Sequence, residues 1–520
     1  MKNLFNNIRP YTEKETLVAV EKLFTNPDFI RQLSIFKDKI NVDEWVKEVL
    51  ACKDQFQFHL TFANRVFHYF IEKTCKKNSY SGFENINPEN QYLFIGNHRD
   101  IVLDSSFLQI YFFKNGYDET RSAIGDNLLA TPMFVELAKI HKMFLVLRSG
   151  TLKEKIASTH LLSSYISHSI FEEKESVWIA QGNGRTKNGD DKTQQGLIKM
   201  LTMSEPDNAM QQLKLMKITP VTISYQYEPC DQLKARELAL SENSPYQKQK
   251  GEDTKSIIEG ITGFKGETHF VIGKPLQQEF DLIPPELPLN DKLSFLCEQI
   301  DNQIYSNYFL YPQNYIAADI QNNSTRFSTQ YSEDEKSDFV NYLNKKAIVS
   351  DVPKEKMMKN LLNIYANPVK NKLILLFCFS AFLLSSFLSL SAQNNRLTNE
   401  NGQLLWQYNQ NVVVDEKQNS FTVTFVFING ISQTAISLRQ DLFNSQIEWI
   451  ETNDIQVEKE ERVSFLTVNL APHQSVVFKY EIKTKLIDKE LLLEKSAVFI
   501  MNEDFEIRKE LISEQNFTKK

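Results

Sequence analysis

Residues 93–106, LFIGNHRDIVLDSS, contain the transition that decides the fold of the first part of the chain. The apolar run at its start is typical of a buried strand, Gly96 and Asn97 break that run, and IVLDSSFLQIYFF indicates a helix. His98 is therefore expected at the carboxyl end of a strand, where open α/β sheets hold their ligands. A nearby carboxylate would make it a general base, although histidines at strand ends often only cap a turn.

Four more apolar runs in the same region predict further strands, namely MFLVLR (143–148), SVWIAQ (176–181), ITPVTISY (218–225) and THFVIG (268–273). Patterns of helical periodicity, such as LKEKIASTHLLSSYISHSIFEE, separate them. Strands interleaved with helices indicate an α/β domain with a largely parallel sheet, here over residues 81–315. Residues 1–80 have helical periodicity and predict an N-terminal helical region.

The sequence pattern changes after this domain. Residues 316–370 are mostly polar and predict a helical linker. Runs such as SFTVTFVFING (420–430) and SVVFKYEIKTKL (475–486) then alternate apolar and polar residues, which is typical of half-buried antiparallel strands. We expect a small all-β sandwich over 398–503, followed by a tail at 504–520.

An apolar segment separates the two halves. Residues 373–390, LILLFCFSAFLLSSFLSL, contain no charge and approach the minimum length of a bilayer-spanning helix. Only Arg396 follows closely, whereas five lysines precede the segment: Lys354, Lys356, Lys359, Lys370 and Lys372. This asymmetry predicts a transmembrane helix at 371–392, with the first half cytoplasmic and the second extracytoplasmic. A buried soluble helix and an internal signal cleaved after Ala392 are the alternatives. The N-terminus lacks an apolar signal-peptide core, so the chain should start in the cytoplasm.

Composition narrows the functional classes. A chain of 520 residues suggests two or three domains, and its net charge of −7 argues against a nucleic-acid partner. The five cysteines include no CxxC pair, so we expect neither a zinc site nor a disulfide framework. No other metal-binding cluster is visible in the sequence, and no Gly-x-Ser-x-Gly nucleophile motif is present.

Basic residues follow two of the predicted strands. Arg148 ends one apolar run, and Arg185 and Lys187 lie in the glycine-rich stretch AQGNGRTKNGDDKTQQG with Gly184. Glycines let backbone amides approach an anion, and guanidinium groups bind phosphate. One such loop alone is usually a solvated turn, but basic residues after two strands, on the edge that carries His98, predict an anion site.

Four blocks in this order resemble the phospholipid/glycerol acyltransferase family, over roughly residues 80–310. They are GNHRDIVLD, MFLVLRS, GRTKNGDDKTQQG and ITPVTISY, with AIGDNLL (123–129) ahead of the second. The resemblance implies transfer of an acyl chain from acyl-CoA or acyl-carrier protein to a hydroxyl of glycerol 3-phosphate or a lysophospholipid, without a further cofactor. It implies catalysis by His98 and Asp104, and substrate binding by Asn97, Arg148, Gly184, Arg185 and Lys187. The expected partners are a lipid acceptor and the membrane, and the expected location is the cytoplasmic side of the inner membrane.

Two departures from the family pattern keep alternatives open. Five residues separate His98 from Asp104 where the family has four, and Asp100 is too near to match. The acidic residue that opens the third block of the family is Gln181 or Asn183 here. An aminolipid or another hydroxy-acyl lipid is therefore an alternative acceptor, and a membrane-tethered, non-catalytic lipid-binding module is the alternative from another functional class.

Overall fold

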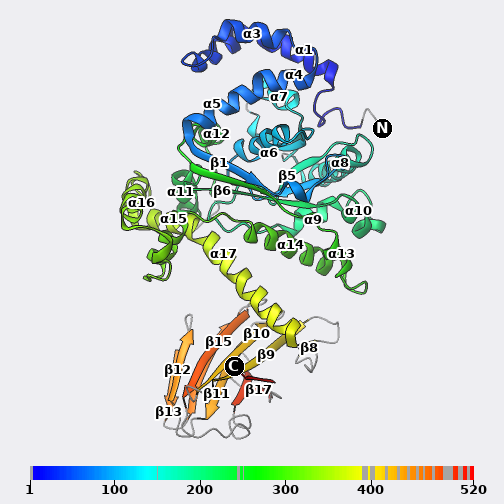
Figure 1. The fold of residues 1–520 in the computed structure, drawn as a ribbon. Coiled ribbons are helices and arrows are strands. Elements are labelled where there is room, and N and C mark those ends of the chain that lie inside the picture. Colours follow the sequence, from blue (N-terminus) through cyan, green and yellow to red (C-terminus); the bar gives the residue numbers. More distant parts are fainter. Residues whose placement is uncertain are drawn as a thin grey trace. The chain divides into compact units, whose positions relative to one another are not determined.

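The computed structural model describes residues 4–388 apart from 130, 149, 243–245 and 250, together with strands between 396 and 519 (Figure 1). Side chains are described as far as Leu373. The chain divides into two compact units, Met1–Phe377 and Cys378–Lys520, and each is described by itself.

The first unit is built on a seven-stranded sheet with the order β1-β7-β6-β2-β5-β3-β4. The strands are β1 (Cys75–Ser81), β2 (Leu93–Gly96), β3 (Arg121–Gly125), β4 (Met143–Val146), β5 (Val177–Ala180), β6 (Thr219–Tyr225) and β7 (Gly266–Ile272). Strands β6, β2, β5, β3 and β4 are mutually parallel, β7 is antiparallel to β6, and β1 is parallel to β7. The predicted α/β class with a largely parallel sheet is confirmed.

Helices cover both faces of this sheet, as α6 and α14 show in Figure 1. The α-helices are α1 (Glu13–Phe24), α2 (Pro27–Gln32), α3 (Val42–Leu50), α4 (Gln55–Phe58), α5 (Asn64–Thr74), α6 (Leu103–Lys114), α7 (Pro132–Ile140), α8 (Leu152–Phe171), α9 (Gln195–Leu201), α10 (Ala209–Leu215), α11 (Asp231–Ser241), α12 (Glu252–Thr262), α13 (Gln278–Asp281), α14 (Leu289–Ser306), α15 (Pro312–Gln321), α16 (Glu333–Lys346) and α17 (Lys354–Leu388). Short turns of 3-10 helix are η1 (Leu33–Phe36), η3 (Phe83–Asn85), η4 (Asp126–Leu128), η5 (Pro206–Asn208) and η6 (Ser328–Gln330), and η2 (His59–Ala63) is a π-helix.

The central strand β2 shows why an unbroken apolar run forms a strand here. Leu93 and Ile95 pack into the core on the side of α8, α9 and α14, whereas Phe94 packs into the core on the side of α5 and α6. Successive side chains of a strand point to opposite faces, so a strand covered on both faces needs apolar residues at every position. All four residues of β2 are buried, which fixes the strand end that carries His98.

The N-terminal helices α1–α5 pack with α7 around one core, which includes Trp45, Phe24 and Ile140. The sheet then begins at Cys75, within the region predicted as helical, because the polar strand β1 pairs with β7 along its backbone. Residues 316–370 are helical, but they are not a free linker. Ile316, Phe339 and Tyr365 of these helices pack with Ala235 and Ala239 of α11 in one hydrophobic core.

The second unit is described by its strands, which are β8 (Arg396–Thr398), β9 (Leu404–Asp415), β10 (Ser420–Asn429), β11 (Thr434–Asp441), β12 (Gln446–Glu451), β13 (Gln456–Glu460), β14 (Val463–Leu470), β15 (Ser475–Lys483), β16 (Ser496–Met501), β17 (Ile507–Leu511) and β18 (Asn516–Lys519). They form two sheets, β12-β15-β10-β9-β18 with β8 beside β9, and β13-β14-β11-β16-β17. Adjacent strands are antiparallel except β18 and β9. Strands β17 and β18 lie in the predicted tail. The side chains of these strands lie outside the described part, so the sandwich stays a prediction.

No helix in the described part of the chain is both long and apolar enough to cross a membrane. Helix α17 leads into the predicted transmembrane segment at 371–392, but the side chains beyond Leu373 lie outside the described residues. The membrane-spanning segment therefore stays a prediction.

Candidate active site

The turn after β2 brings His98 to the edge where the parallel strands end. Gly96 is the last residue of β2, and a Cβ atom there would lie 2.8 Å from Cγ2 of Val221 and 3.0 Å from Nε1 of Trp178. Only glycine fits between the two neighbouring strands at this point. The ring of His98 then lies edge-on to Trp178, with 5.8 Å between the ring centroids.

The imidazole of His98 is held by the carboxylate of Asp104, on the first turn of α6. Nδ1 of His98 lies 2.9 Å from Oδ2 of Asp104, which also accepts hydrogen bonds from the backbone amides of Arg99 (2.6 Å) and Asp100 (2.9 Å). The Tyr225 hydroxyl donates to Oδ1 of Asp104 at 2.8 Å. Asp104 is buried, while the His98 side chain keeps 13 % exposure. When Nδ1 donates to this carboxylate, the lone pair of the neutral ring is on Nε2, which is the arrangement of a general base.

The carboxylate of Asp100, also near His98, bonds to the backbone instead of the imidazole. Oδ1 of Asp100 accepts hydrogen bonds from the amides of Val102 (2.9 Å) and Leu103 (2.8 Å), so it caps the start of α6. Its Oδ2 packs against Gly260 of α12, where a Cβ would lie 2.1 Å away. The geometry thus pairs His98 with Asp104 and not with Asp100.

The side-chain amide of Asn97 is fully hydrogen-bonded within the protein. Its amide nitrogen donates to Oδ2 of Asp191 and to the carbonyl of Ile223, both at 3.0 Å, and its oxygen accepts from the Ile223 amide at 2.8 Å. Asn97 is buried, and its amide joins the end of β2 to β6 and to Asp191.

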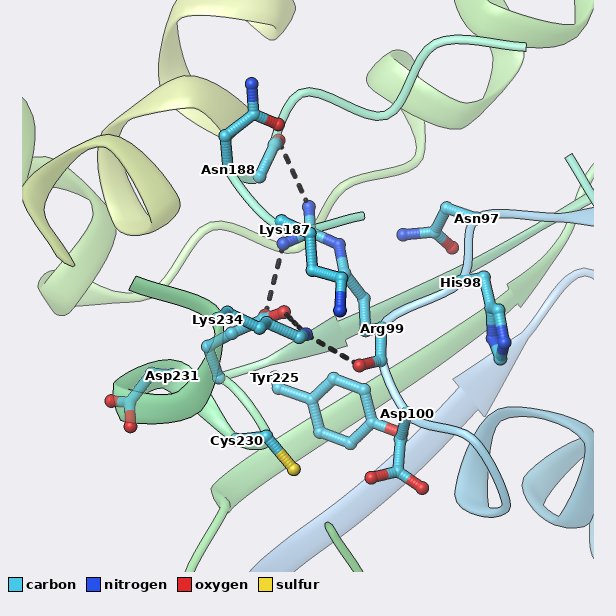
Figure 2. Close-up of polar contacts among 12 residues, drawn as sticks. Asn97, His98, Arg99, Asp100, Lys187, Asn188, Tyr225, Cys230, Asp231 and Lys234 are labelled. Carbon is cyan, nitrogen blue, oxygen red and sulfur yellow. Dashed lines mark hydrogen bonds and ion pairs between the residues drawn. The ribbon is translucent and has the colours of Figure 1, made fainter. Parts of the chain in front are cut away.

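Behind the histidine lies a buried group of four alternating charges, the charge cluster Arg99, Asp191, Glu228 and Lys234. Arg99 contacts Asp191 (2.6 Å from Nη2 to Oδ2) and Glu228 (3.1 Å), and Lys234 contacts Glu228. Lys234 also donates to the Arg99 carbonyl at 2.6 Å, as Figure 2 shows. His98 and Arg99 follow each other, but their side chains point in different directions (Figure 2).

The charge cluster holds the turn that carries His98 from behind. Its two positive and two negative charges balance, which a buried position requires. Sequence reasoning did not find these residues. The available signal was that a polar stretch follows each parallel strand at the same edge, with Asp191 after β5 and Glu228 after β6.

The glycine-rich stretch forms the β5–α9 loop, residues 181–194. Gly184 has φ +99°, and no atom lies within 4 Å of where its Cβ would be. Nη1 of Arg185 is buried and has no hydrogen-bond partner among the described residues. The amide of Thr186 donates to the His98 carbonyl at 2.8 Å, which holds the loop beside the histidine. An unpaired guanidinium nitrogen next to an open backbone is suited to an anion.

Lys187 is already paired. Its ammonium group lies 2.6 Å from Oε2 of Glu237 on α11. Burial, helped by the charge of Arg185, lowers the pKa of Lys187 to about 8. In this structure Lys187 fastens the loop to α11.

Arg148 follows a strand farther along the sheet edge than the strand that carries His98. It follows β4, the edge strand, which is three strand spacings from β2, a distance of about 14 Å. Arg148 is exposed, its backbone amide donates to Asp126, and its guanidinium lies near Gly125. The fold therefore brings together His98, Asp104, Asn97 and the β5–α9 loop, whereas Arg148 follows a strand farther along the same edge.

The position of the missing acidic residue is occupied by amides. Gln181 is 3 % exposed, and neither end of its amide has a hydrogen-bond partner in the described part of the chain. The Asn183 backbone amide donates to Gln194 at 2.9 Å. Among the residues that the structure describes, no three His, Cys, Asp or Glu side chains come together as a metal site.

Comparisons with known proteins match one part of this chain to a family model. Residues 77–224 match the family model described as Acyltransferase. No curated protein sequence matches the chain. A crystal structure of the 1-acyl-sn-glycerophosphate (LPA) acyltransferase PlsC from Thermotoga maritima has 10 % identity and a TM-score of 0.29, covering 55 % of this chain and 96 % of that chain. The yeast delta-COP-I mu-homology domain has 11 % identity and a TM-score of 0.16, covering 18 % and 38 %. At these scores neither likeness carries a structural conclusion.

Proposed function

We propose that this acyltransferase, whose acyltransferase domain includes residues 77–224, transfers an acyl chain from acyl-CoA or acyl-carrier protein to a hydroxyl of glycerol 3-phosphate or a lysophospholipid. The observation that carries the proposal is the pair His98–Asp104, with Nδ1 and Oδ2 2.9 Å apart at the carboxyl edge of the sheet. A non-catalytic binding module is not retained, because the matched domain is that of an enzyme.

The proposed reaction needs only a base. Nε2 of His98 takes the proton of the acceptor hydroxyl as its oxygen attacks the thioester carbonyl. This proton transfer is typically worth about 10²–10⁴ in rate. Asp104 stabilises the imidazolium that forms. The C–S bond then breaks, and the thiolate leaves and takes the proton from His98, so an ester and a free thiol are the products.

A phosphate on the acceptor is supported by the β5–α9 loop. Arg185 has a buried nitrogen without a partner among the described residues, and the backbone at Gly184 is open. A guanidinium at the site would bind a phosphate oxygen through a charge-assisted hydrogen bond.

A second acceptor class is a hydroxyl of an aminolipid or another hydroxy-acyl lipid. Arg148 follows β4, whose backbone is about 14 Å from β2 by strand spacing, and Lys187 is paired with Glu237. This leaves Arg185 as the available cation of the three predicted ones. A site with one cation also suits an acceptor without a phosphate.

A panel of acceptors tests the proposal. Full-length protein with acyl-CoA or acyl-carrier-protein thioester is given glycerol 3-phosphate, a lysophospholipid, or a phosphate-free hydroxy-lipid, and thiol release and product mass are measured. We expect esters only with phosphate-bearing acceptors, and a lower apparent affinity for them in Arg185→Ala. Product from the phosphate-free lipid alone would establish the second acceptor class instead.

We further propose attachment to the inner membrane, with the acyltransferase domain cytoplasmic and the second unit extracytoplasmic. The lysines before residue 373 support this orientation, because the cytoplasmic side carries the excess of positive charge. Thioester donors are also found on that side.

A further inference from the structure

Helix α17 contacts the β5–α9 loop, although α17 lies far outside the residues that match the family model. Nδ2 of Asn367 donates to the carbonyl of Asn188 at 2.9 Å. Nδ2 of Asn371 donates to Oδ1 of Asp190 at 3.1 Å. The two asparagines are four positions apart along the helix, so they share one face. This face is turned toward the loop.

A third contact on the same face depends on a proline and a glycine. Pro368 has no amide hydrogen, so the carbonyl of Ile364 lacks its usual donor within the helix. Gly189 of the loop packs against this carbonyl, with φ +79°, and a Cβ at Gly189 would lie 2.2 Å from the oxygen. The loop can therefore approach the helix this closely only with glycine at position 189.

The loop is held from the other side by the charge cluster. Nη2 of Arg99 donates to the Gly189 carbonyl at 3.4 Å and to Asp191 at 2.6 Å. Lys372 of α17 donates to the carbonyl of Tyr308, whose hydroxyl donates to Asp191 at 2.8 Å. Residues 188–191 thus lie between α17 and the residue that follows His98.

We propose that α17 sets the position of the β5–α9 loop, and that Asn367 and Asn371 are positioning residues for acceptor binding. This inference rests on the proposed function, in which Arg185 of that loop binds the acceptor. Asn367 and Asn371 do not touch the acceptor. They fix the backbone from 188 to 190, and so fix the approach of Arg185 and Gly184 to the anion. An acyltransferase domain without α17 has the catalytic histidine but lacks this support for its acceptor loop.

The test uses the full-length chain with Asn367→Ala and Asn371→Ala combined. Asn360→Ala is the matched control, because Asn360 lies on the same helix and donates an equivalent hydrogen bond, at 3.1 Å, to Ala235 of α11 instead of the loop. We expect faster hydrogen exchange of the amides of residues 186–191 in the double variant, and a rise of about tenfold in KM for the acceptor. The kcat value and the KM for the thioester should stay within about twofold, and Asn360→Ala should change neither exchange in the loop nor acceptor KM.

Unchanged exchange in the loop would overturn the inference, and so would faster exchange without a change in acceptor KM. The wild-type protein could prove to use no phosphate-bearing acceptor, which would overturn the proposed acceptor. Faster loop exchange in the double variant, together with a higher KM for the actual acceptor, would still support the positioning of the loop by α17. A second pair of variants checks the contact at the proline. Gly189→Ala should raise acceptor KM, whereas Gly116→Ala, at φ +74° with open space around its Cβ position, should not.

Discussion

The hydroxyl of Tyr225 donates a hydrogen bond of 2.8 Å to Oδ1 of Asp104, so the end of β6 orients the carboxylate that holds His98. Burial, together with the carboxylates of Asp104 and Asp100, raises the pKa of Tyr225 well above its ordinary value. Tyr225 is therefore a hydrogen-bond donor at every pH at which the enzyme works.

Tyr225→Phe should lower kcat about tenfold, because a hydrogen bond to a charged group is worth about 1.5–3 kcal/mol and part of this orients the base. The readout is the pH–rate profile, whose shape should change with the environment of the Asp104–His98 pair. Tyr305→Phe is the matched control, since the buried Tyr305 hydroxyl has no hydrogen-bond partner among the described residues. An unchanged profile in Tyr225→Phe would show that this hydrogen bond has no role in catalysis.

His98→Ala should abolish acyl transfer while the protein stays folded, because His98 lies on a partly exposed turn outside the core. Thiol release from the thioester should fall by at least 10². His160→Ala, on an exposed part of α8, should keep full activity. Asp104→Asn should be nearly as inactive as His98→Ala. A rate above about a tenth of wild type in His98→Ala would exclude the general-base role.

Asp191→Ala should destabilise the protein by about 3–5 kcal/mol, because it leaves a buried guanidinium without its main partner. Arg99 and Asp191 have exposed side-chain fractions of 5 % and 0 %. Chemical denaturation measures the loss. Arg31→Ala breaks an ion pair whose side chains are 78 % and 75 % exposed, and should cost less than about 1 kcal/mol. Similar losses in the two variants would mean that the charge cluster contributes no more than a surface pair.

Asp301→Asn should make stability less dependent on pH. Burial, and to a lesser degree the carboxylates of Asp191 and Asp190, raises the pKa of Asp301 to about 7. Between about pH 4 and pH 7 the folded protein keeps a proton that the unfolded chain has lost, so the stability contributed by Asp301 falls as the pH rises. Asparagine keeps an oxygen for the amide and hydroxyl of Thr193, which bond to Oδ1 at 2.8 Å and 2.6 Å.

The measurement for Asp301 is urea denaturation of both proteins at pH 5 and pH 8. Stability of Asp301→Asn relative to wild type should be higher at pH 8 than at pH 5, and the difference should level off above about pH 7. A difference that is the same at both pH values would contradict the prediction.

The proposed orientation in the membrane is tested with a reporter that is active only outside the cytoplasm. Fused after Lys520 it should be active, and fused to a chain that ends at Asn344 it should be silent. Silence at Lys520 would mean that residues 373–390 are a buried helix. Activity in a short fragment that begins near Gln393 would mean that this segment is a cleaved signal.

The sequence predicts the strands that an apolar run marks and misses the other two strands of the first sheet. Apolar runs mark β2, β4, β5, β6 and β7. β1, with the sequence CKKNSYS, is mostly exposed and holds its place through backbone hydrogen bonds to β7, so no side-chain pattern marks it. β3, with the sequence RSAIG, is short and begins with a charge.

The sequence likewise predicts some residues of the candidate site and misses others. His98 and Asp104 are close in the chain, and a turn between strand and helix brings them together. The partners in the charge cluster lie 92 and 129 residues apart, and a sequence does not reveal which charges a fold will bury. The contacts of α17 with the β5–α9 loop are longer still, across 179 and 181 residues. The sequence pattern marks that region only as the end of a polar linker and the start of an apolar segment.

The balanced charge cluster also bears on how this protein can diverge. Losing Asp191 alone leaves Arg99 without its main partner, and losing Glu228 alone leaves Lys234 without its carboxylate. Each loss lowers the free energy of unfolding, because the remaining charge is buried. Substitutions that survive selection at these four positions should therefore be inherited in compensating pairs. Since Glu228 and Lys234 lie beyond residue 224, their joint presence with Arg99 and Asp191 would identify true descendants of this protein among the many chains that share only the acyltransferase blocks.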